Sequence, residues 1–351
     1  MHISPFCGYI VDSDKVIFDH RFYDEMREDF MSLYQKGVFH RISDAPAYFI
    51  LEIKKANKYF TGIITLTSIL DYTKGKIKAH EQTIVKKQKI HKKLLTSRKA
   101  MIKPAAVLIN RNQKLTDTLH KIKKNAKPVI SVLFPDSSTR QRLWSVDDQH
   151  TIAQINIQFK KENKAIIADG HHRFAAVAKV NGPRSTNQIL TAYFTTDQME
   201  VYSFYRILRP LKNQSSHSIL QAIQKKAISW IQVKSIPMEP GEAFYLIHQN
   251  RIYAFKLKKN RNTLWPHLFG DQITKGIFKI KNESISKRVF FEEVTISKKE
   301  YTQMVNQYPD DFIFRLPALD TNEVLHTKTL LPPKSTLMMP RIINGLVVHM
   351  I

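Results

Sequence analysis

The sequence contains a single cysteine, Cys7, among its 351 residues. An internal disulfide is therefore excluded, as is a metal site built from several thiolates. No apolar run approaches the ~20 residues that a membrane-spanning helix needs. Residues 1–11 also lack the basic segment and following apolar run that form a signal peptide. These absences predict a cytoplasmic protein without a membrane partner.

Two further kinds of site are missing from the sequence. It has no Gly-Lys-Ser or Gly-Lys-Thr loop, which excludes an ordinary P-loop kinase. None of the 14 histidines is followed by another at the His-x-x-x-His spacing, so a zinc site is not expected. There is also no internal repeat, low-complexity linker or heptad pattern. With 43% hydrophobic residues, the chain can form a substantial core and two or three domains.

Positive charge is abundant: 55 lysines and arginines face 30 acidic residues, for a formal net charge of +25. A nucleic acid or another strongly anionic ligand is one explanation. The other is a lysine-rich composition of the kind that AT-rich genomes produce, because the basic residues are spread along the chain in short runs. The sequence has no recognisable helix-turn-helix, so nucleic-acid binding stays the less favoured alternative.

The apolar pattern predicts helices and strands of mixed spacing, and therefore an α+β (mixed α/β) fold. Residues 16–43 have helical spacing, and Gly37 is expected to end that helix. Residues 47–53 and 59–66 are predicted to form a hairpin. Further strands are expected at residues 104–109, 128–134, 143–146, 189–195, 202–208, 244–248, 252–257, 289–294 and 312–316. Further helices are expected at residues 67–70, 84–95, 115–122, 152–157 and 216–232.

The stretch with the most chemical information is residues 165–176. An apolar run ends at Asp169, Gly170 allows a turn, and His171, His172 and Arg173 lead into an Ala-rich helical stretch. A strand that passes through a glycine turn into a helix N-terminus is a common way to build a phosphate site. So many adjacent groups that handle charge or protons are rarely needed for folding alone. Residues 169–173, called the 169–173 box, are therefore the candidate active site.

The box and three other segments carry a family resemblance. The other segments are residues 46–49 with 59–63, residues 77–83, and residues 331–336 with 340 and 345–346. Together they resemble the bacterial and archaeal family called domain of unknown function 1015. The box, preceded by His80-Glu81, also resembles the ParB/sulfiredoxin superfamily, which includes partition proteins, sulfiredoxin and kinases that phosphorylate free serine. Sulfiredoxin chemistry itself is not expected, because His171 stands where that chemistry needs a cysteine.

The resemblance implies a division of the chain into three regions. Residues 76–210 would form a ParB/sulfiredoxin-like catalytic core. Residues 1–75 would form an N-terminal α/β region with the hairpin, and residues 211–351 a C-terminal α/β region.

The resemblance also implies an activity: phosphoryl transfer between a nucleotide and a small hydroxy amino acid, with serine or phosphoserine as the leading guess. ATP, ADP or pyrophosphate would donate or accept the phosphoryl group, with Mg²⁺ as cofactor. The alternatives are a nucleotide-responsive nucleic-acid-binding protein of the ParB type and an inactive ligand-binding descendant. The second alternative is suggested by Tyr205, which stands where the family has histidine, and by Ile3-Ser4-Pro5-Phe6, which replaces a Pro-Pro-Tyr-Asp-type segment.

Each candidate residue has an expected role under this reading. Glu81 would accept the proton of the substrate hydroxyl, with His172 and Asp169 as further catalytic groups. Asp169 would also hold Mg²⁺ or orient a histidine. The groups expected to bind phosphate or nucleotide are Gly170, His171, His172, Arg173 and Arg206. The groups expected to bind the substrate are His80, Lys334 and Ser335, although a Pro-Pro turn explains the last two equally well.

Overall fold

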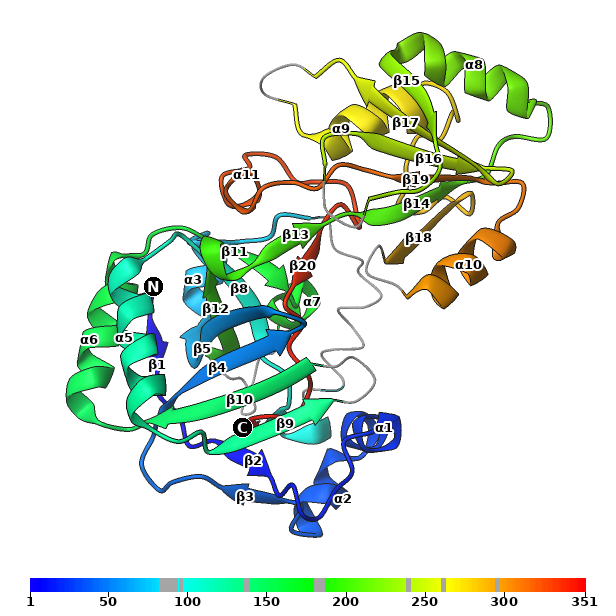
Figure 1. Ribbon diagram of the computed structural model, residues 1–351. Coiled ribbons are helices and arrows are strands. Elements are labelled where there is room, and N and C mark those ends of the chain that lie inside the picture. The colour runs from blue at the N-terminus through cyan, green and yellow to red at the C-terminus, as the bar shows by residue number, and fades with distance from the viewer. Residues whose placement is uncertain are drawn as a thin grey trace. The chain divides into compact units, whose positions relative to one another are not determined.

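The computed structural model describes residues 1–81, 94, 97–134, 139–179, 187–237, 241–259, 263–293 and 297–351. They form two compact units: unit 1 contains Met1–Glu200 and Pro340–Ile351, and unit 2 contains Val201–Met339. Both units mix helices with strands, which confirms the α+β prediction (Figure 1). The basic helix predicted over residues 84–95 lies outside the described residues except for Leu94.

A mixed sheet forms the centre of unit 1. Nine strands belong to it within the described residues, and β1 (Ile3–Ser4) joins it by pairing with β5 (Lys58–Ser68). Neighbouring strands are antiparallel except for two parallel pairs, β6 (Ile77–Lys78) with β11 (Ala165–Asp169) and β8 (Ala105–Ile109) with β12 (Gln188–Thr195). The other eight strands, in spatial order, are β6 (Ile77–Lys78), β11 (Ala165–Asp169), β8 (Ala105–Ile109), β12 (Gln188–Thr195), β5 (Lys58–Ser68), β4 (Tyr48–Lys55), β10 (Thr139–Val146) and β9 (Ile130–Phe134).

The remaining elements of unit 1 surround this sheet. Asn112 and Asp148 cap α5 (Gln113–Asn125) and α6 (Gln149–Lys161) by accepting hydrogen bonds from first-turn N–H groups, and the two helices lie side by side in Figure 1. Two small sheets pair β2 (Tyr9–Val11) with β3 (Phe39–Arg41) and β7 (Ala100–Met101) with β21 (His349–Met350). The helices are α1 (His20–Glu28), α2 (Phe30–Gln35), α3 (Ile69–Thr73), α5 (Gln113–Asn125), α6 (Gln149–Lys161), α7 (His171–Val177) and the 3₁₀ turn η2 (Thr196–Gln198).

The predicted hairpin is confirmed as β4 and β5. Its pairings with later strands explain why unit 1 is a single compact unit. β4 pairs with β10 along eight residues, and β5 pairs with β12 along six. The hairpin therefore shares one sheet with segments from the predicted 76–210 region. For this reason the predicted boundary at residues 75–76 lies inside unit 1, between α3 and β6.

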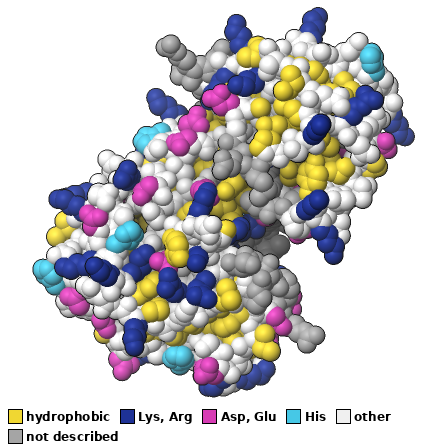
Figure 2. Space-filling view, viewed as in Figure 1, with side chains coloured by type: hydrophobic (Ala, Val, Ile, Leu, Met, Phe, Trp, Pro, Cys, Tyr) yellow, Lys and Arg dark blue, Asp and Glu magenta, His cyan; other side chains and the backbone are white. Residues whose placement is uncertain are grey.

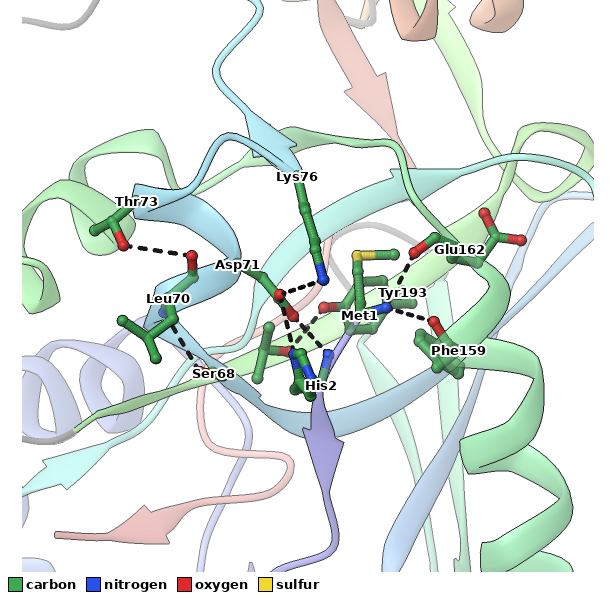
Figure 3. Close-up of polar contacts among 11 residues, drawn as sticks. Met1, His2, Ser68, Leu70, Asp71, Thr73, Lys76, Phe159, Glu162 and Tyr193 are labelled. Carbon is green, nitrogen blue, oxygen red and sulfur yellow. Dashed lines mark hydrogen bonds and ion pairs between the residues drawn. The ribbon is translucent and has the colours of Figure 1, made fainter.

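A buried carboxylate fixes the segment that leads into β6. Asp71, on α3, is 1% exposed and accepts hydrogen bonds from the His2 backbone N–H (2.5 Å) and from His2 Nδ1 (3.2 Å). Lys76 Nζ lies 3.4 Å from the same carboxylate (Figure 3). Burial opposes ionisation of Asp71, but these hydrogen bonds and charges outweigh it and lower its pKa. Lys76 directly precedes β6, which runs parallel to β11.

Unit 2 is built on a second sheet, of six strands among the described residues. Alternate residues of its strands face two separate cores: Ile313 packs on one face, and Phe312 and Phe314 on the other. The strands, in spatial order, are β15 (Ala227–Val233), β17 (Arg251–Leu257), β16 (Phe244–His248), β19 (Phe312–Arg315), β14 (Phe204–Leu208) and β18 (Val289–Glu293). The other elements are α8 (Ser216–Lys226), α9 (Trp265–Phe269), the π-helix η3 (Gly270–Lys275), α10 (Lys298–Gln307), α11 (Thr321–Leu325) and the pair β13 (Glu200–Tyr202) and β20 (Leu337–Met339).

The prediction of one helix over residues 216–232 is wrong at its second half. The helix α8 ends at Lys226, and Ala227–Val233 forms the strand β15. Four of those seven residues are β-branched or aromatic, which favours a strand. Backbone pairing of β15 with β17 and stacking of Trp230 on Tyr253, with ring centroids 4.8 Å apart, stabilise the extended form.

Candidate active site

The 169–173 box lies at the junction of β11 and α7 in unit 1. Four buried residues of β11 end at Asp169, and Gly170 then turns the chain with a φ of +100° into the first turn of α7. A Cβ atom at Gly170 would lie 2.6 Å from Arg173 Nη2 and 2.9 Å from Ala105 Cβ. Glycine is therefore required here by both conformation and space.

Two cations flank the carboxylate of Asp169. Arg173 Nη2 donates to Asp169 Oδ2 at 2.9 Å, and Lys103 Nζ lies 3.8 Å from the same oxygen. Desolvation by the surrounding protein would raise the pKa of Asp169, but the charges of Arg173 and Lys103 outweigh it and hold that pKa below its ordinary value. The side chain of Asp169 is nevertheless 61% exposed, so the ionised group is open to a ligand.

Lys103 is a site residue that the sequence analysis missed. It lies two residues before β8, and β8 runs antiparallel to β11, with Ala106 opposite Asp169. The start of β8 therefore lies beside the end of β11, which brings Lys103 to the box. Burial lowers the pKa of Lys103, although Asp169 works in the opposite direction. Only the sheet pairing identifies this lysine, because nothing in the local sequence distinguishes it from the other lysines.

The structure brings His80 and Glu81 to the box. Ile77 pairs with Ala165 and Lys78 with Ile166, so the residues that follow β6 run alongside the end of β11. His80 is 1% exposed, its Nδ1 donates to the Ile167 carbonyl oxygen at 2.7 Å, and its ring centroid lies 4.9 Å from that of His171. Glu81 Oε1 lies 3.7 Å from His80 Nε2, and the Glu81 side chain is 14% exposed.

The two histidines of the box are half-buried. Burial, reinforced by His80, lowers the pKa of His171 to about 3, so this ring is neutral near pH 7. Its Nε2 is buried and has no hydrogen-bond partner among the described residues. Arg173 Nε is also buried without a hydrogen-bond partner among the described residues, while Nη2 of the same side chain donates to Asp169. The box thus holds two buried polar atoms that have no hydrogen-bond partner in the described part of the protein.

The other three predicted site residues belong to unit 2. Arg206 is 1% exposed, lies 3.4 Å from Glu283 and contacts the rings of Phe269 and Phe291. Lys334 lies over the ring of Phe204 at 4.6 Å. The hydroxyl of Ser335 donates to the Pro332 carbonyl oxygen at 2.6 Å, which closes a turn. Within unit 2 these contacts serve packing, and the phosphate and substrate roles of the three residues stay predictions.

Three broader features bear on function. Within the described ranges, no group of three or more His, Cys, Asp or Glu side chains is arranged to hold a metal ion, so Asp169 as a Mg²⁺ ligand stays a prediction. In the same ranges no helix is both long and apolar enough to cross a membrane. Lysine and arginine side chains are scattered among acidic and hydrophobic ones over the face in Figure 2.

Comparison with solved structures finds several chains that match this one over most of their length. A free serine kinase in complex with AMP is 14% identical, with 85% of this chain and 91% of that chain covered and a TM-score of 0.38. A conserved hypothetical protein from Pyrococcus furiosus is 14% identical, with coverages of 82% and 95% and a TM-score of 0.41. SbnI from Staphylococcus aureus, with a C-terminal truncation, is 11% identical, with coverages of 79% and 82% and a TM-score of 0.40.

A comparison with curated proteins finds no match. A family profile does match, over residues 11–277, and its description is a protein of unknown function, DUF1015. That match spans most of the chain and agrees with the resemblance carried by the box and the His80-Glu81 segment. The chain belongs to the DUF1015 family.

Proposed function

We propose that the protein transfers a phosphoryl group between a nucleotide and a small hydroxy amino acid, with serine or phosphoserine as the first candidate. The observation that supports this proposal is the packing of His80 against His171, which joins the segment that carries Glu81 to the box that carries Asp169 and Arg173. Phosphoryl transfer needs the same two elements: positive groups around the phosphate and an acceptor for the hydroxyl proton.

The cationic side of the site consists of Lys103 and Arg173. Both are held by contact with Asp169, and both side chains keep some exposure, at 29% and 21%. Arg173 Nε and neutral His171 Nε2 are polar atoms without partners in the described residues, and each can serve a phosphate oxygen or a substrate group. We assign phosphate binding to Lys103, Arg173 and the histidines of the box.

Glu81 is assigned the role of general base. It would take the proton of the substrate hydroxyl as the oxygen forms its bond to phosphorus and the bond to the leaving nucleotide oxygen breaks. His80 supports this step as a positioning residue. Because Nδ1 of His80 carries a hydrogen toward the Ile167 carbonyl, its Nε2 is unprotonated in the neutral ring and can accept a hydrogen bond from protonated Glu81.

A Mg²⁺ ion fits this site only if the nucleotide supplies most of its ligands. Asp169 offers one carboxylate, and Mg²⁺ in nucleotide sites is commonly held by one or two carboxylates together with phosphate oxygens and water. When bound, the ion would neutralise charge on the phosphates. Asp169 would hold the ion, while Arg173 and Lys103 keep the carboxylate ionised.

Phosphorus NMR of the purified protein tests the proposal. ATP, ADP and pyrophosphate are each offered with Mg²⁺ and serine or a related hydroxy amino acid, and phosphoserine is offered with ADP or AMP for the reverse direction. We expect a new phosphomonoester signal in at least one combination. Glu81→Gln should reduce its rate about 100-fold or more with little change in nucleotide affinity, because the base acts in the chemical step.

The control is Glu28→Gln, which removes an exposed carboxylate from the end of α1. It should leave the rate unchanged. Normal turnover by Glu81→Gln would remove Glu81 from the mechanism, and no turnover in any combination would argue for the inactive ligand-binding alternative.

A further inference from the structure

The carboxylate of Asp169 occupies both of the cations to which we assign phosphate binding. One of its oxygens, Oδ2, accepts a hydrogen bond from Arg173 Nη2 at 2.9 Å and lies 3.8 Å from Lys103 Nζ. Guanidinium and ammonium groups are the usual partners of phosphate oxygens as well as of carboxylates. A phosphate group that bound through these two cations would therefore compete with Asp169 for them.

The ion pair of Asp169 with Arg173 is built into the box although it adds little to stability. The Asp169 side chain is 61% exposed, and ion pairs that are open to solvent contribute little to folding. A Cβ atom at Gly170 would lie 2.6 Å from Nη2 and 2.8 Å from Nε of Arg173. Glycine thus leaves room for the guanidinium to lie against the backbone beside Asp169. This arrangement points to a role in binding.

The C-terminal segment of unit 1 adds a third cation. The Gly345 N–H donates to the Ile102 carbonyl oxygen at 2.7 Å, so this segment runs beside the residues that precede Lys103. Burial lowers the pKa of Lys103, and Arg173 and Arg341 lower it further against the opposing charge of Asp169. These three cations outnumber the carboxylate of Asp169, and their surplus charge attracts a multiply charged anion.

We propose that Asp169 is an internal competitor of the phosphate ligand: its carboxylate holds Arg173 and Lys103 until a phosphate group takes them. A phosphate or diphosphate group carries more charge than a carboxylate and has more acceptor oxygens. It can also accept from Arg173 Nε, which is buried and has no partner among the described residues. The exchange leaves the carboxylate of Asp169 free, as its proposed role toward Mg²⁺ requires.

This inference rests on the phosphate-binding part of the proposed function, and it reverses the usual expectation for a site residue. Loss of the Asp169 charge should strengthen binding of the ligand. Calorimetry on the full-length protein measures the Kd of pyrophosphate and of ADP in the presence of EDTA, so that no divalent cation takes part. Asp169→Asn removes the charge and keeps an oxygen that accepts from Arg173. Its Kd for at least one ligand should fall about tenfold or more.

Asp169→Ser removes the same charge by a second route and should also bind more tightly than the unmodified protein. Circular dichroism and urea denaturation show whether each variant is folded. Misfolding cannot explain a gain in affinity, because an unfolded site would bind more weakly. Unchanged or weaker binding of both ligands by the folded variants would overturn the inference.

Asp24→Asn is the matched control. Asp24 is 64% exposed and pairs with Arg27 at 3.2 Å, as Asp169 pairs with Arg173. It belongs to α1, whose Tyr23 packs on Phe134 of β9, at the opposite edge of the sheet from β6 and β11. This variant should leave both Kd values unchanged. An equal gain in affinity for Asp24→Asn would show a general effect of charge and overturn the inference.

The binding experiment separates this inference from the proposed reaction. Tighter binding by Asp169→Asn without turnover in the phosphorus NMR experiment would support the inference and contradict the proposed reaction. Turnover by the unmodified protein without tighter binding by the variants would have the opposite meaning. If neither ligand bound to any of these proteins up to about 10 mM, the inference and the phosphate-binding assignment would fail together.

Discussion

The imidazole rings of His80 and His171 lie with their centroids 4.9 Å apart, at an angle of 56° between ring planes. The two residues belong to distant segments, which the parallel pairing of β6 with β11 brings together. The contact makes His80-Glu81 and the 169–173 box one structural feature. A substitution in either segment should therefore alter the structure of the other.

Replacing Lys103 with methionine should weaken nucleotide binding. The lysine is one of two cations beside Asp169, and methionine keeps most of its volume while removing its charge. We expect the Kd for ADP, measured by calorimetry, to rise about tenfold or more. Lys114→Met, which removes the charge of an exposed lysine on α5, is the control. Equal ADP affinity for Lys103→Met and the unmodified protein would exclude Lys103 from phosphate binding.

Gly170→Ala should destabilise unit 1 and displace Arg173. Alanine disfavours a φ of +100°, and its Cβ would lie 2.6 Å from Arg173 Nη2. A loss of about 1–3 kcal/mol in the free energy of unfolding is expected from urea denaturation. Gly241→Ala is the matched control, because no atom beyond the neighbouring residues in the chain lies within 4 Å of the Cβ that it adds. The first expectation fails if both variants unfold at the same urea concentration.

Acid should destabilise the protein below about pH 6.5. Burial lowers the pKa of His171 to about 3 and of His349 to about 4, from ordinary values of 6.5. Between those values the unfolded chain binds more protons than the folded one, so stability falls as pH falls, by about 1.4 kcal/mol per pH unit for each such histidine. Urea denaturation at several pH values measures this slope.

His349→Gln provides the control for the acid effect. Glutamine has no proton to gain, so the slope between pH 6.5 and about 4 should decrease by one histidine's contribution. A slope that is the same in both proteins would mean that His349 titrates normally in the folded state.

Glu52→Gln should cost about 1–3 kcal/mol of stability. Glu52 is 7% exposed on β4 and accepts hydrogen bonds from Lys123 Nζ and Arg142 Nε, each at 2.9 Å. Burial works against its charge, but these partners outweigh it and lower its pKa. Glutamine would leave both cations without a countercharge. Glu25→Gln breaks an exposed pair with Lys36 and should change stability by less than about 0.5 kcal/mol in the same thermal or urea assay.

Much of the fold could be predicted from local pattern. The hairpin of β4 and β5, the buried strands β8 and β11, and helices α5 and α6 all have clear periodicity or strongly apolar runs. The prediction failed where a helical pattern continued past Lys226, because the strand β15 is stabilised by its partner β17, which follows later in the chain. The predicted region boundary at residues 75–76 lies within unit 1, where β5 finds its partner β12 far along the sequence.

The sequence by itself determined which chemical groups are available: a box of Asp169, Gly170, two histidines and Arg173 after a buried strand, and a His80-Glu81 pair upstream. Only the tertiary structure decided which other groups join them. Lys103 lies beside Asp169 because β8 runs antiparallel to β11, and His80 reaches His171 because β6 runs parallel to it. Strand pairing depends on backbone hydrogen bonds between distant segments, and no local pattern in the side chains specifies which segments will meet.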